Sequence, residues 1–296
     1  MNEAEIQAAL KQLKDADLKD FVNITVGLAN TTYRLTTNDG EVFILRHLIL
    51  QTPDNARVEA RLQKILNLNG VVTPTYLKLR GKDAVGDVNG KYFTISKKLE
   101  GHTPTKTTLD LVHSFGETLA KIHDSLAGCG ELISPSPTQW MRLDNVEKEI
   151  EHCSGELRDR FTKLLLESKG ILDYDLPKSV IHSDLFLDNT FGDDKKITVV
   201  FDFETAEYTT RLLDIARTYL PLIHDSMLTP KEIKHHLLAG YDSRSKQPLT
   251  KRELDLLPKA IVYVAVACAS WLQNNNGEKF VSNYLQSASL AKSEMQ

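Results

Sequence analysis

The sequence predicts an α+β protein with two lobes: a small lobe of antiparallel strands with one helix over residues 1–97, and a large, mainly α-helical lobe over residues 98–296. Three observations lead to this prediction. Strand-like segments are concentrated before residue 97, helical periodicity dominates after it, and one short β-rich segment at residues 179–204 interrupts the helical part. No linker is long enough to separate two independent domains.

The small lobe begins with a helical segment and continues with strands. Ile6, Leu10 and Leu13 recur with helical spacing near the N-terminus. Residues 21–46 are rich in β-branched and aromatic side chains, which predicts three antiparallel strands. Asp39-Gly40 indicates the turn between the second and third of them, since this pair tolerates the positive φ that tight hairpins need.

One helix and two further strands complete the small lobe. The helix is predicted over Asp54–Asn69, where apolar residues keep helical spacing until Gly70. Strand-like stretches follow at Tyr76–Arg80 and Lys91–Lys97, with glycine-containing turns between them. The small lobe is therefore expected to end near residue 97.

Helical patterns account for most of the large lobe. Apolar spacing predicts one helix over residues 109–126 and another over residues 146–164. Thr229–Glu232 and Thr250–Glu253 are capping boxes, and each marks a helix start. The longest apolar run, Ala260–Leu272, has 13 residues, fewer than the ~20 that a membrane span needs. We therefore expect a buried core helix there and no membrane partner.

Composition and charge exclude several classes of protein. The chain has 36 Lys and Arg against 40 Asp and Glu, a net charge of −4, so it lacks the basic excess of nucleic-acid-binding proteins. Its three cysteines, Cys129, Cys153 and Cys268, form no CxxC pair, which argues against a disulfide framework or a zinc ribbon. The charged N-terminal segment is unlike a signal peptide, so we expect a cytoplasmic protein. The sequence carries no signal for an oligomeric state.

The residues that indicate a chemistry lie in the β-rich segment, which reads VIHSDLFLDNTFGDDKKITVVFDFE from Val180 to Glu204. A strand, a loop and a hairpin followed by Asp202 bring Asp184, Asn189 and Asp202 toward one point. Three oxygen-bearing side chains beside buried strands suit a hard cation such as Mg²⁺, which keeps waters and borrows phosphate oxygens. The pattern therefore predicts a magnesium–nucleotide site. In phosphoryl transfer, Asp184 could instead accept the proton of an attacking hydroxyl.

Two other interpretations of this segment are weaker. The first, a polar loop followed by a turn aspartate, does not account for the order of these residues or for the strands beside them. A hydrolase triad of His182, Ser183 and Asp184 is disfavoured because the three stand too close in sequence, and the chain has no GxSxG elbow. We expect His182 to pack beneath the loop.

The spacing His182-x-Asp184-x₄-Asn189, with Asp202 after one hairpin, resembles the aminoglycoside phosphotransferase and choline kinase family. The local sequence HSDLFLDN is similar to the homoserine kinase branch of that family. The resemblance implies a bilobal protein-kinase-like fold with ATP and Mg²⁺ between the lobes. It extends over about residues 21 to 220, where Leu213–Ala216 looks like the helix whose aspartate braces the catalytic loop.

The same resemblance assigns roles in the small lobe and just after it. Residues 27–33 look like the hairpin loop over the phosphates, and residues 43–46 look like the third strand. Residues 58–60 look like the helix with an ion-pairing glutamate. Residues 96–101 look like the hinge that holds adenine, and residues 119–123 look like the next helix. The implied nucleotide-binding residues are Asn30, Thr31, Arg46, Glu59, Lys97 and Leu99.

The chain departs from the family at one position and from protein kinases at several. Arg46 stands where the family often has lysine, and its guanidinium can bind two phosphate oxygens at once. The chain has no GxGxxG loop and no APE motif, and only 12 positions separate Asp202 from Asp214. Because this is too short for a peptide-docking activation segment, a small-molecule acceptor is favoured over a protein.

Candidate acceptor-binding residues carry weaker signals. Asp188 lies in the loop, Glu204 and Glu207 follow Asp202, and Trp271 lies in the apolar helix. The carboxylates could bind an amine and the indole could hold a cation by a cation–π contact, while solvent exposure and core packing explain such residues as well. Homoserine, choline, ethanolamine, other amino alcohols, sugars and aminoglycosides all stay open as acceptors.

We therefore predict an ATP- and Mg²⁺-dependent phosphotransferase that moves the γ-phosphate to a hydroxyl of a small, amine-bearing molecule. Asp184 is the expected base, and Asn189 and Asp202 are the expected metal ligands. The alternative is a non-catalytic nucleotide-binding regulatory protein on the same fold. Arg46 in place of lysine keeps this alternative open, while retention of Asp184, Asn189 and Asp202 disfavours it.

Overall fold

The computed structural model describes residues 1–24, 30–80, 83–136, 138–224 and 226–293. The chain forms two compact units. Unit 1 comprises Met1–Gly101 and Ser136–Thr138, and unit 2 comprises His102–Pro135 and Gln139–Gln296. The segment Ser136–Thr138 joins unit 1 because Asn55 Nδ2 donates hydrogen bonds to the hydroxyls of Ser136 and Thr138. A division by sequence position alone does not include this segment.

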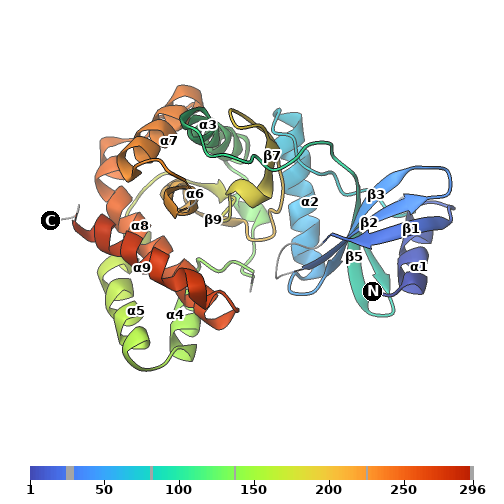
Figure 1. The fold of residues 1–296 in the computed structure, drawn as a ribbon, viewed down its shortest axis with the longest axis horizontal. Helices are drawn as coiled ribbons and strands as arrows, with labels where there is room; N and C mark the ends of the chain where they lie inside the picture. Colours follow the sequence, from blue (N-terminus) through green and yellow to red (C-terminus); the bar gives the residue numbers. More distant parts are fainter. Residues whose placement is uncertain (25–29, 81–82, 137, 225, 294–296) are drawn as a thin grey trace. The chain divides into compact units, whose positions relative to one another are not determined.

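Unit 1 is built on one antiparallel sheet with strand order β1-β2-β3-β5-β4 (Figure 1). Its strands are β1 (Leu18–Asn23), β2 (Asn30–Thr37), β3 (Val42–Leu48), β4 (Val85–Val88) and β5 (Lys91–Lys97). The predicted turn at Asp39-Gly40 is confirmed, since β2 pairs with β3 from Thr36↔Val42 onward and Gly40 has φ +87°. Residues 25–29, within the predicted first strand and phosphate loop, lie outside the described part of the chain.

The strand predicted at Tyr76–Arg80 is wrong. These residues make only single bridges, Tyr76↔Ser96 and Leu79↔Asp83, and the strand beside β5 is β4. The reason is the Asn89-Gly90 pair, whose φ values of +56° and +78° form a tight turn that joins Val88 directly to Lys91. Asn-Gly is among the strongest hairpin signals in a sequence.

Both helices in the described part of unit 1 lie where helical spacing predicts them. Helix α1 (Glu3–Leu13) begins at a capping box of Asn2 and Glu5. Its buried residues pack on a face of the sheet, in a core that includes Ile6, Leu10, Leu35, Leu45, Phe93 and Ile95. Helix α2 (Pro53–Leu68) begins at the Thr52 cap and buries Glu59, which matters for the site.

Unit 2 is mainly helical and contains two short pairs of strands (Figure 1). Its longer helices are α3 (Leu109–Ser125), α4 (Leu143–His152), α5 (Gly155–Ser168), α6 (Arg211–His224), α7 (Pro230–Arg244), α8 (Lys251–Asn274) and α9 (Glu278–Ser293). The single helix predicted over residues 146–164 is two helices, because Cys153 and Ser154 are extended and Gly155 has φ +58°.

Helix α8 forms the centre of unit 2. It is long and apolar enough to pass a test for a membrane span, but 72% of its apolar window is buried inside the protein. Both predicted capping boxes are confirmed at the starts of α7 and α8. The predicted buried core helix is therefore the observed one.

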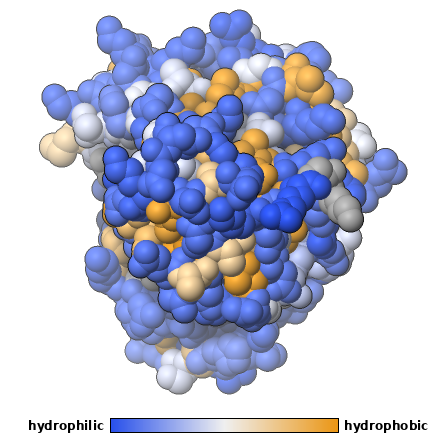
Figure 2. All heavy atoms as spheres, turned by 90° about the vertical axis from the view of Figure 1, so that its right-hand side faces the viewer, coloured by the Kyte–Doolittle hydropathy of each residue, from blue (hydrophilic) through white to orange (hydrophobic). Residues whose placement is uncertain are grey.

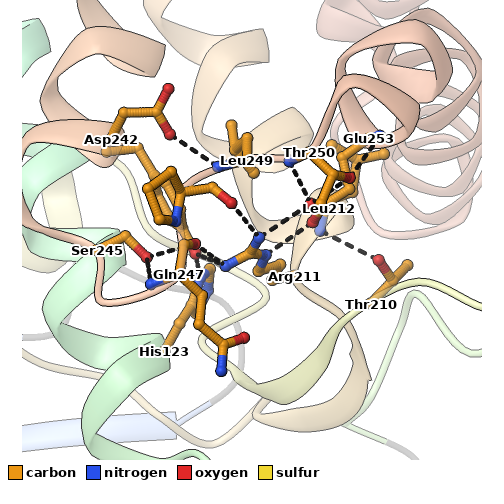
Figure 3. A network of polar contacts seen from close by, with 12 residues as sticks. His123, Thr210, Arg211, Leu212, Asp242, Ser245, Gln247, Leu249, Thr250 and Glu253 are labelled. Atoms are coloured by element: carbon orange, nitrogen blue, oxygen red, sulfur yellow. Dashed lines mark hydrogen bonds and ion pairs between the residues drawn. The ribbon is translucent and has the colours of Figure 1, made fainter.

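A buried ion pair connects the start of α6 with the start of α8 (Figure 3). Arg211 donates from Nε and Nη2 to the two carboxylate oxygens of Glu253, at 2.7 and 2.9 Å. Its remaining donors reach the carbonyl oxygens of Gln247 and Pro248 and the hydroxyl of Tyr241. Because both charged groups are almost completely buried and every donor of the guanidinium has a partner, this pair is a structural element of unit 2.

Helices α3 and α7 cross with their backbones in direct contact. A Cβ atom on Gly116 would lie 2.1 Å from Leu237 O, and one on Gly240 would lie 2.0 Å from His113 O. Only glycine fits at such distances, so the two glycines allow α3 to lie where His123 reaches Asp214 of α6.

Figure 2 shows one face of the structure, coloured by hydropathy. Hydrophilic side chains dominate this face, and apolar side chains lie between them in small groups. Such a face is usual for a protein surface in water, where scattered apolar residues need no special explanation.

Candidate active site

The β-rich segment of unit 2 forms two antiparallel pairs. β6 (Lys178–Ile181) pairs with β9 (Glu207–Thr210), and β7 (Thr190–Gly192) pairs with β8 (Ile197–Val200). The predicted order of strand, loop and hairpin is confirmed. The hairpin register continues past its strands, since the Phe201 amide donates to Asn189 O at 3.1 Å. Asp202 therefore follows the residue that faces Asn189.

Asp214, on α6, holds the backbone of the loop after β6. Its two carboxylate oxygens accept the amide hydrogens of His182 (2.8 Å) and Ser183 (2.9 Å), and His123 Nε2 lies 3.0 Å from Oδ2. Burial raises the pKa of Asp214, but the His123 contact and the loop amides outweigh it, so this pKa lies below its ordinary value. An ionised Asp214 can hold Ser183 at its unusual φ of +68°.

Asp184 lies at the centre of the loop with both carboxylate oxygens engaged. Arg217 donates to Oδ1 from Nη2 at 2.6 Å and from Nε at 3.1 Å. Asn189 Nδ2 donates to Oδ2 at 3.2 Å and to the Asp184 carbonyl at 2.8 Å. Burial raises the pKa of Asp184, and nearby Asp202 adds to this, while Arg217 and His182 act in the opposite direction. Asp202 and Asp184 therefore lie within electrostatic reach of each other.

The oxygen atoms near Asp184 suit a divalent cation whose coordination is completed by phosphate oxygens. The amide nitrogen of Asn189 is directed to Asp184, so its amide oxygen is the atom that would coordinate. Asp202 supplies a carboxylate from a backbone position with φ +72°. Over the described ranges, no group of three or more His, Cys, Asp or Glu side chains could hold a metal. Two hard protein oxygens are what Mg²⁺ uses when phosphate and water complete its coordination.

His182 is structural, as predicted. Its ring is buried, contacts Phe203 at 4.4 Å between centroids, and lies with Nε2 3.0 Å from Phe201 O. Its Nδ1 atom accepts the Asp184 amide hydrogen at 3.2 Å. These contacts connect the loop to the segment that carries Asp202.

In unit 1, Arg46 lies beside Glu59. Arg46 Nη1 is 3.3 Å from Glu59 Oε1 and 3.2 Å from the Tyr76 hydroxyl. Gln51 and Gln63 also donate to the Glu59 carboxylate, at 2.8 and 3.3 Å. Glu59 is 1% exposed and Arg46 is 13% exposed at the side chain, so the pair is nearly buried.

The other predicted nucleotide-binding residues occupy varied positions in unit 1. Asn30 begins β2 and is buried, and its side-chain oxygen accepts the Ile49 amide hydrogen at 3.0 Å. Thr31 follows it and pairs with His47. Lys97 ends β5 and is exposed, and Leu99 lies just after it and is partly exposed.

Among the predicted acceptor-binding residues, Glu207 lines an open surface pocket. This pocket, of about 390 Å³, is bounded by Arg142, Leu143, Asp144, Glu147 and Glu207. Burial raises the pKa of Glu207 to about 7, and Oε2 has no hydrogen-bond partner among the described residues. Asp188 is exposed, Glu204 is buried, and Trp271 lies partly exposed near the end of α8.

Sequence reasoning missed Arg217. Its guanidinium lies over the rings of Phe186 and Trp140, at 5.0 and 5.6 Å from their centroids, and contacts Asp184. A signal was present, because Arg217 follows Asp214 by three positions on one helix and therefore lies on the same face.

A comparison with protein-family models matches residues 20–252 to the phosphotransferase enzyme family. Among curated proteins, homoserine kinase of Methylobacillus flagellatus is 28% identical over 216 residues, which cover 72% of this chain and 66% of that protein. Homoserine kinase of Brucella anthropi is 27% identical over 289 residues, which cover 94% and 87% of the two chains.

Solved structures share the fold. The amicoumacin kinase hAmiN, in complex with AMP-PNP, Ca²⁺ and Ami, superposes with a TM-score of 0.78 at 14% identity, covering 97% of this chain and 93% of that one. A microcompartment-associated aminopropanol kinase gives 0.73 at 20% identity, covering 99% of both. An ethanolamine kinase of Plasmodium vivax gives 0.67 at 14% identity, covering 97% and 87%. The predicted kinase-like fold class is confirmed by these similarities.

Proposed function

The chain belongs to the phosphotransferase enzyme family and is a small-molecule kinase, and from this premise we propose that it transfers the γ-phosphate of Mg-ATP to a hydroxyl of an amine-bearing metabolite in the cytoplasm. One observation carries the proposal: Asp184 and Asn189 are hydrogen-bonded to each other within a loop that Asp214 holds, and Asp202 lies within electrostatic reach. Phosphoryl transfer depends on this kind of positioning.

Each of these residues has a separate proposed role. Asp184 accepts the proton of the acceptor hydroxyl, and its raised pKa favours this role. Asn189 and Asp202 would coordinate Mg²⁺, which when bound neutralises phosphate charge. Arg46, held by Glu59, would donate to phosphate oxygens. Asn30, Thr31, Lys97 and Leu99 stay as proposed nucleotide contacts, and Asp188, Glu204 and Trp271 as proposed acceptor contacts.

We propose that the amine of the acceptor binds at Glu207. Asp144 and Glu147 already have partners in Arg142 and Lys169, whereas Glu207 has a buried oxygen without one among the described residues. Glu207 pairs with Ile181 across the sheet, three residues before Asp184. Besides the amicoumacin kinase, the similar proteins are kinases of homoserine, aminopropanol and ethanolamine, and each of these three molecules carries an amine and a hydroxyl.

A coupled assay of ADP release with Mg-ATP tests the proposal across homoserine, aminopropanol, ethanolamine, choline, sugars and aminoglycosides. We expect turnover with at least one amine-bearing alcohol, and turnover slower by about 10²–10⁴-fold with the Asp184→Asn variant on that substrate. Turnover restricted to sugars would contradict the proposed acceptor class.

The alternative of a non-catalytic nucleotide-binding protein is tested by the same preparation. Thermal melting with and without Mg-ATP reports binding independently of turnover. A clear upward shift in Tm together with no ADP release across the whole panel would favour the regulatory function over the enzymatic one.

A further inference from the structure

We propose that Arg217 is a positioning residue for phosphoryl transfer: it holds one oxygen of the Asp184 carboxylate, Oδ1, and thereby presents the other, Oδ2, to the acceptor hydroxyl. The inference rests on the proposed function and goes beyond it, because it assigns the reacting atom and the side chain that orients it.

The contact between Arg217 and Asp184 uses only one carboxylate oxygen. Nε and Nη2 both donate to Oδ1, at 3.1 and 2.6 Å. In the common fork-to-fork arrangement an arginine donates to both oxygens, which would direct both of them toward the guanidinium. Here Oδ2 receives the longer hydrogen bond from Asn189, at 3.2 Å. The Asp184 side chain is 27% exposed against 9% for Arg217, so an acceptor can reach the carboxylate but not the guanidinium.

The surroundings of Arg217 hold its guanidinium in place. Phe186, in the same loop as Asp184, and Trp140 flank it at 5.0 and 5.6 Å. Its third nitrogen, Nη1, is buried without a hydrogen-bond partner in the part of the chain that the structure describes. An unsatisfied buried donor is costly, and apolar side chains often stabilise a core equally well. Fold stability alone therefore does not explain an arginine here, whereas orientation of Asp184 does.

Helix α6 divides the support of the loop between neighbouring residues. Asp214 binds the amides of His182 and Ser183, and Thr218 Oγ1 donates to Leu185 O at 2.9 Å. These two residues hold the backbone on either side of Asp184. Arg217, on the same helix, holds its side chain, so both backbone and carboxylate are set by one rigid element.

The reaction then has a defined direction for each atom. The acceptor oxygen forms a bond to the γ-phosphorus, and its proton moves to Oδ2 of Asp184. The bond between the γ-phosphorus and its bridging oxygen breaks, and the electron pair leaves with ADP. Asp184 afterwards releases the proton to water. Arg217 neither gains nor loses a proton, and its contribution is the orientation of the carboxylate.

The test compares Arg217→Ala with Arg217→Lys and with a control, Arg244→Lys, which changes an exposed arginine of α7 that pairs with Glu117. For Arg217→Ala we expect kcat to fall by about 10²-fold, as for a misplaced catalytic group, with an unchanged KM for Mg-ATP. Added guanidinium chloride at low concentration is expected to restore part of the lost kcat. Arg244→Lys should leave Tm and kcat nearly unchanged, with no response to guanidinium.

Several outcomes overturn the inference. The inference is wrong if folded Arg217→Ala keeps wild-type kcat. It is also wrong if kcat falls, guanidinium does not restore it, and Mg-ATP binding weakens as well. If Arg217→Ala does not fold, Arg217→Lys decides: it keeps the charge but not the planar fork, so wild-type kcat in the folded variant contradicts the proposal and a lowered kcat with unchanged KM supports it. Absence of turnover in the wild type on every acceptor is a separate result, which opposes the proposed function.

Discussion

The Nε2 atom of His123 lies 3.0 Å from Oδ2 of Asp214, and both side chains are buried. His123 comes from α3 and Asp214 from α6, so the contact connects two helices behind the loop that carries Asp184. Tyr241 of α7 contacts the other ring nitrogen of His123 at 2.9 Å. The loop is therefore supported by three helices of unit 2.

His123→Ala is expected to lower the free energy of unfolding by about 1–3 kcal/mol, because Asp214 then lies buried with one partner fewer. Urea unfolding measures this change. His235→Ala is the control, since His235 is exposed and its replacement should change stability by less than about 0.5 kcal/mol. Equal stabilities of the two variants would contradict the supporting role of His123.

Asp184→Asn and Asp202→Ala should both strongly reduce transfer, but for different reasons. Asp184→Asn removes the proton acceptor, so we expect kcat to fall by about 10²–10⁴-fold while Mg-nucleotide binding is retained. Asp202→Ala removes a proposed metal ligand, so Mg²⁺-dependent nucleotide binding should weaken. Isothermal titration calorimetry with a non-hydrolysable nucleotide, with and without EDTA, separates the two. Turnover within about tenfold of wild type in either variant would refute its assigned role.

Arg46→Ala is expected to raise the KM for Mg-ATP by about 10- to 100-fold, because a hydrogen bond to a charged group contributes about 1.5–3 kcal/mol. Arg46→Lys should have a smaller effect, since the charge beside Glu59 is kept. Arg57→Ala removes a more exposed arginine of α2 that pairs with Asp54 and Asp83, and serves as the control. An unchanged KM in Arg46→Ala would remove this residue from the phosphate site.

Glu207→Gln should change how stability depends on pH. The pKa of Glu207 is raised from 4.5 to about 7, so the folded state binds this proton more tightly than the unfolded state. The favourable contribution of this proton to the free energy of unfolding is complete below pH 4.5 and is lost as the pH rises through about 7. The free energy of unfolding of Glu207→Gln should therefore exceed that of wild type by on the order of 1–3 kcal/mol at about pH 8, and by almost nothing at about pH 4.

Denaturant unfolding at those two pH values measures the effect. Glu147→Gln is the matched control from the same pocket, because Glu147 is 47% exposed at the side chain and pairs with Lys169. If both variants show the same pH dependence, the buried carboxyl of Glu207 is not its source.

Local signals predicted much of the structure. The Asp39-Gly40 turn and the capping boxes at Thr229 and Thr250 were recognisable because each depends on a few neighbouring residues. The loop with Asp184 and Asn189 was recognisable for a similar reason, since its function requires a short, fixed spacing.

The errors arose where long-range contacts or backbone geometry, and not local composition, determine the structure. Tyr76–Arg80 has strand composition, but the Asn89-Gly90 turn places β4 beside β5 instead. The contact of Arg217 with Asp184 depends on how α6 packs against the loop, 33 residues away in sequence. Its spacing from Asp214 places Arg217 on the same face of α6, but the contact itself follows only from the packing of that helix.

The crossing of α3 and α7 at Gly116 and Gly240 has a consequence for laboratory evolution of this enzyme. A methyl group at either glycine would push the helices apart and carry His123 away from Asp214, although both glycines are distant in sequence from Asp184. Libraries that aim to broaden the range of acceptors should therefore leave both positions unvaried. A screen that varies these two positions would lose variants because the helices no longer pack, whichever acceptor the variants bind.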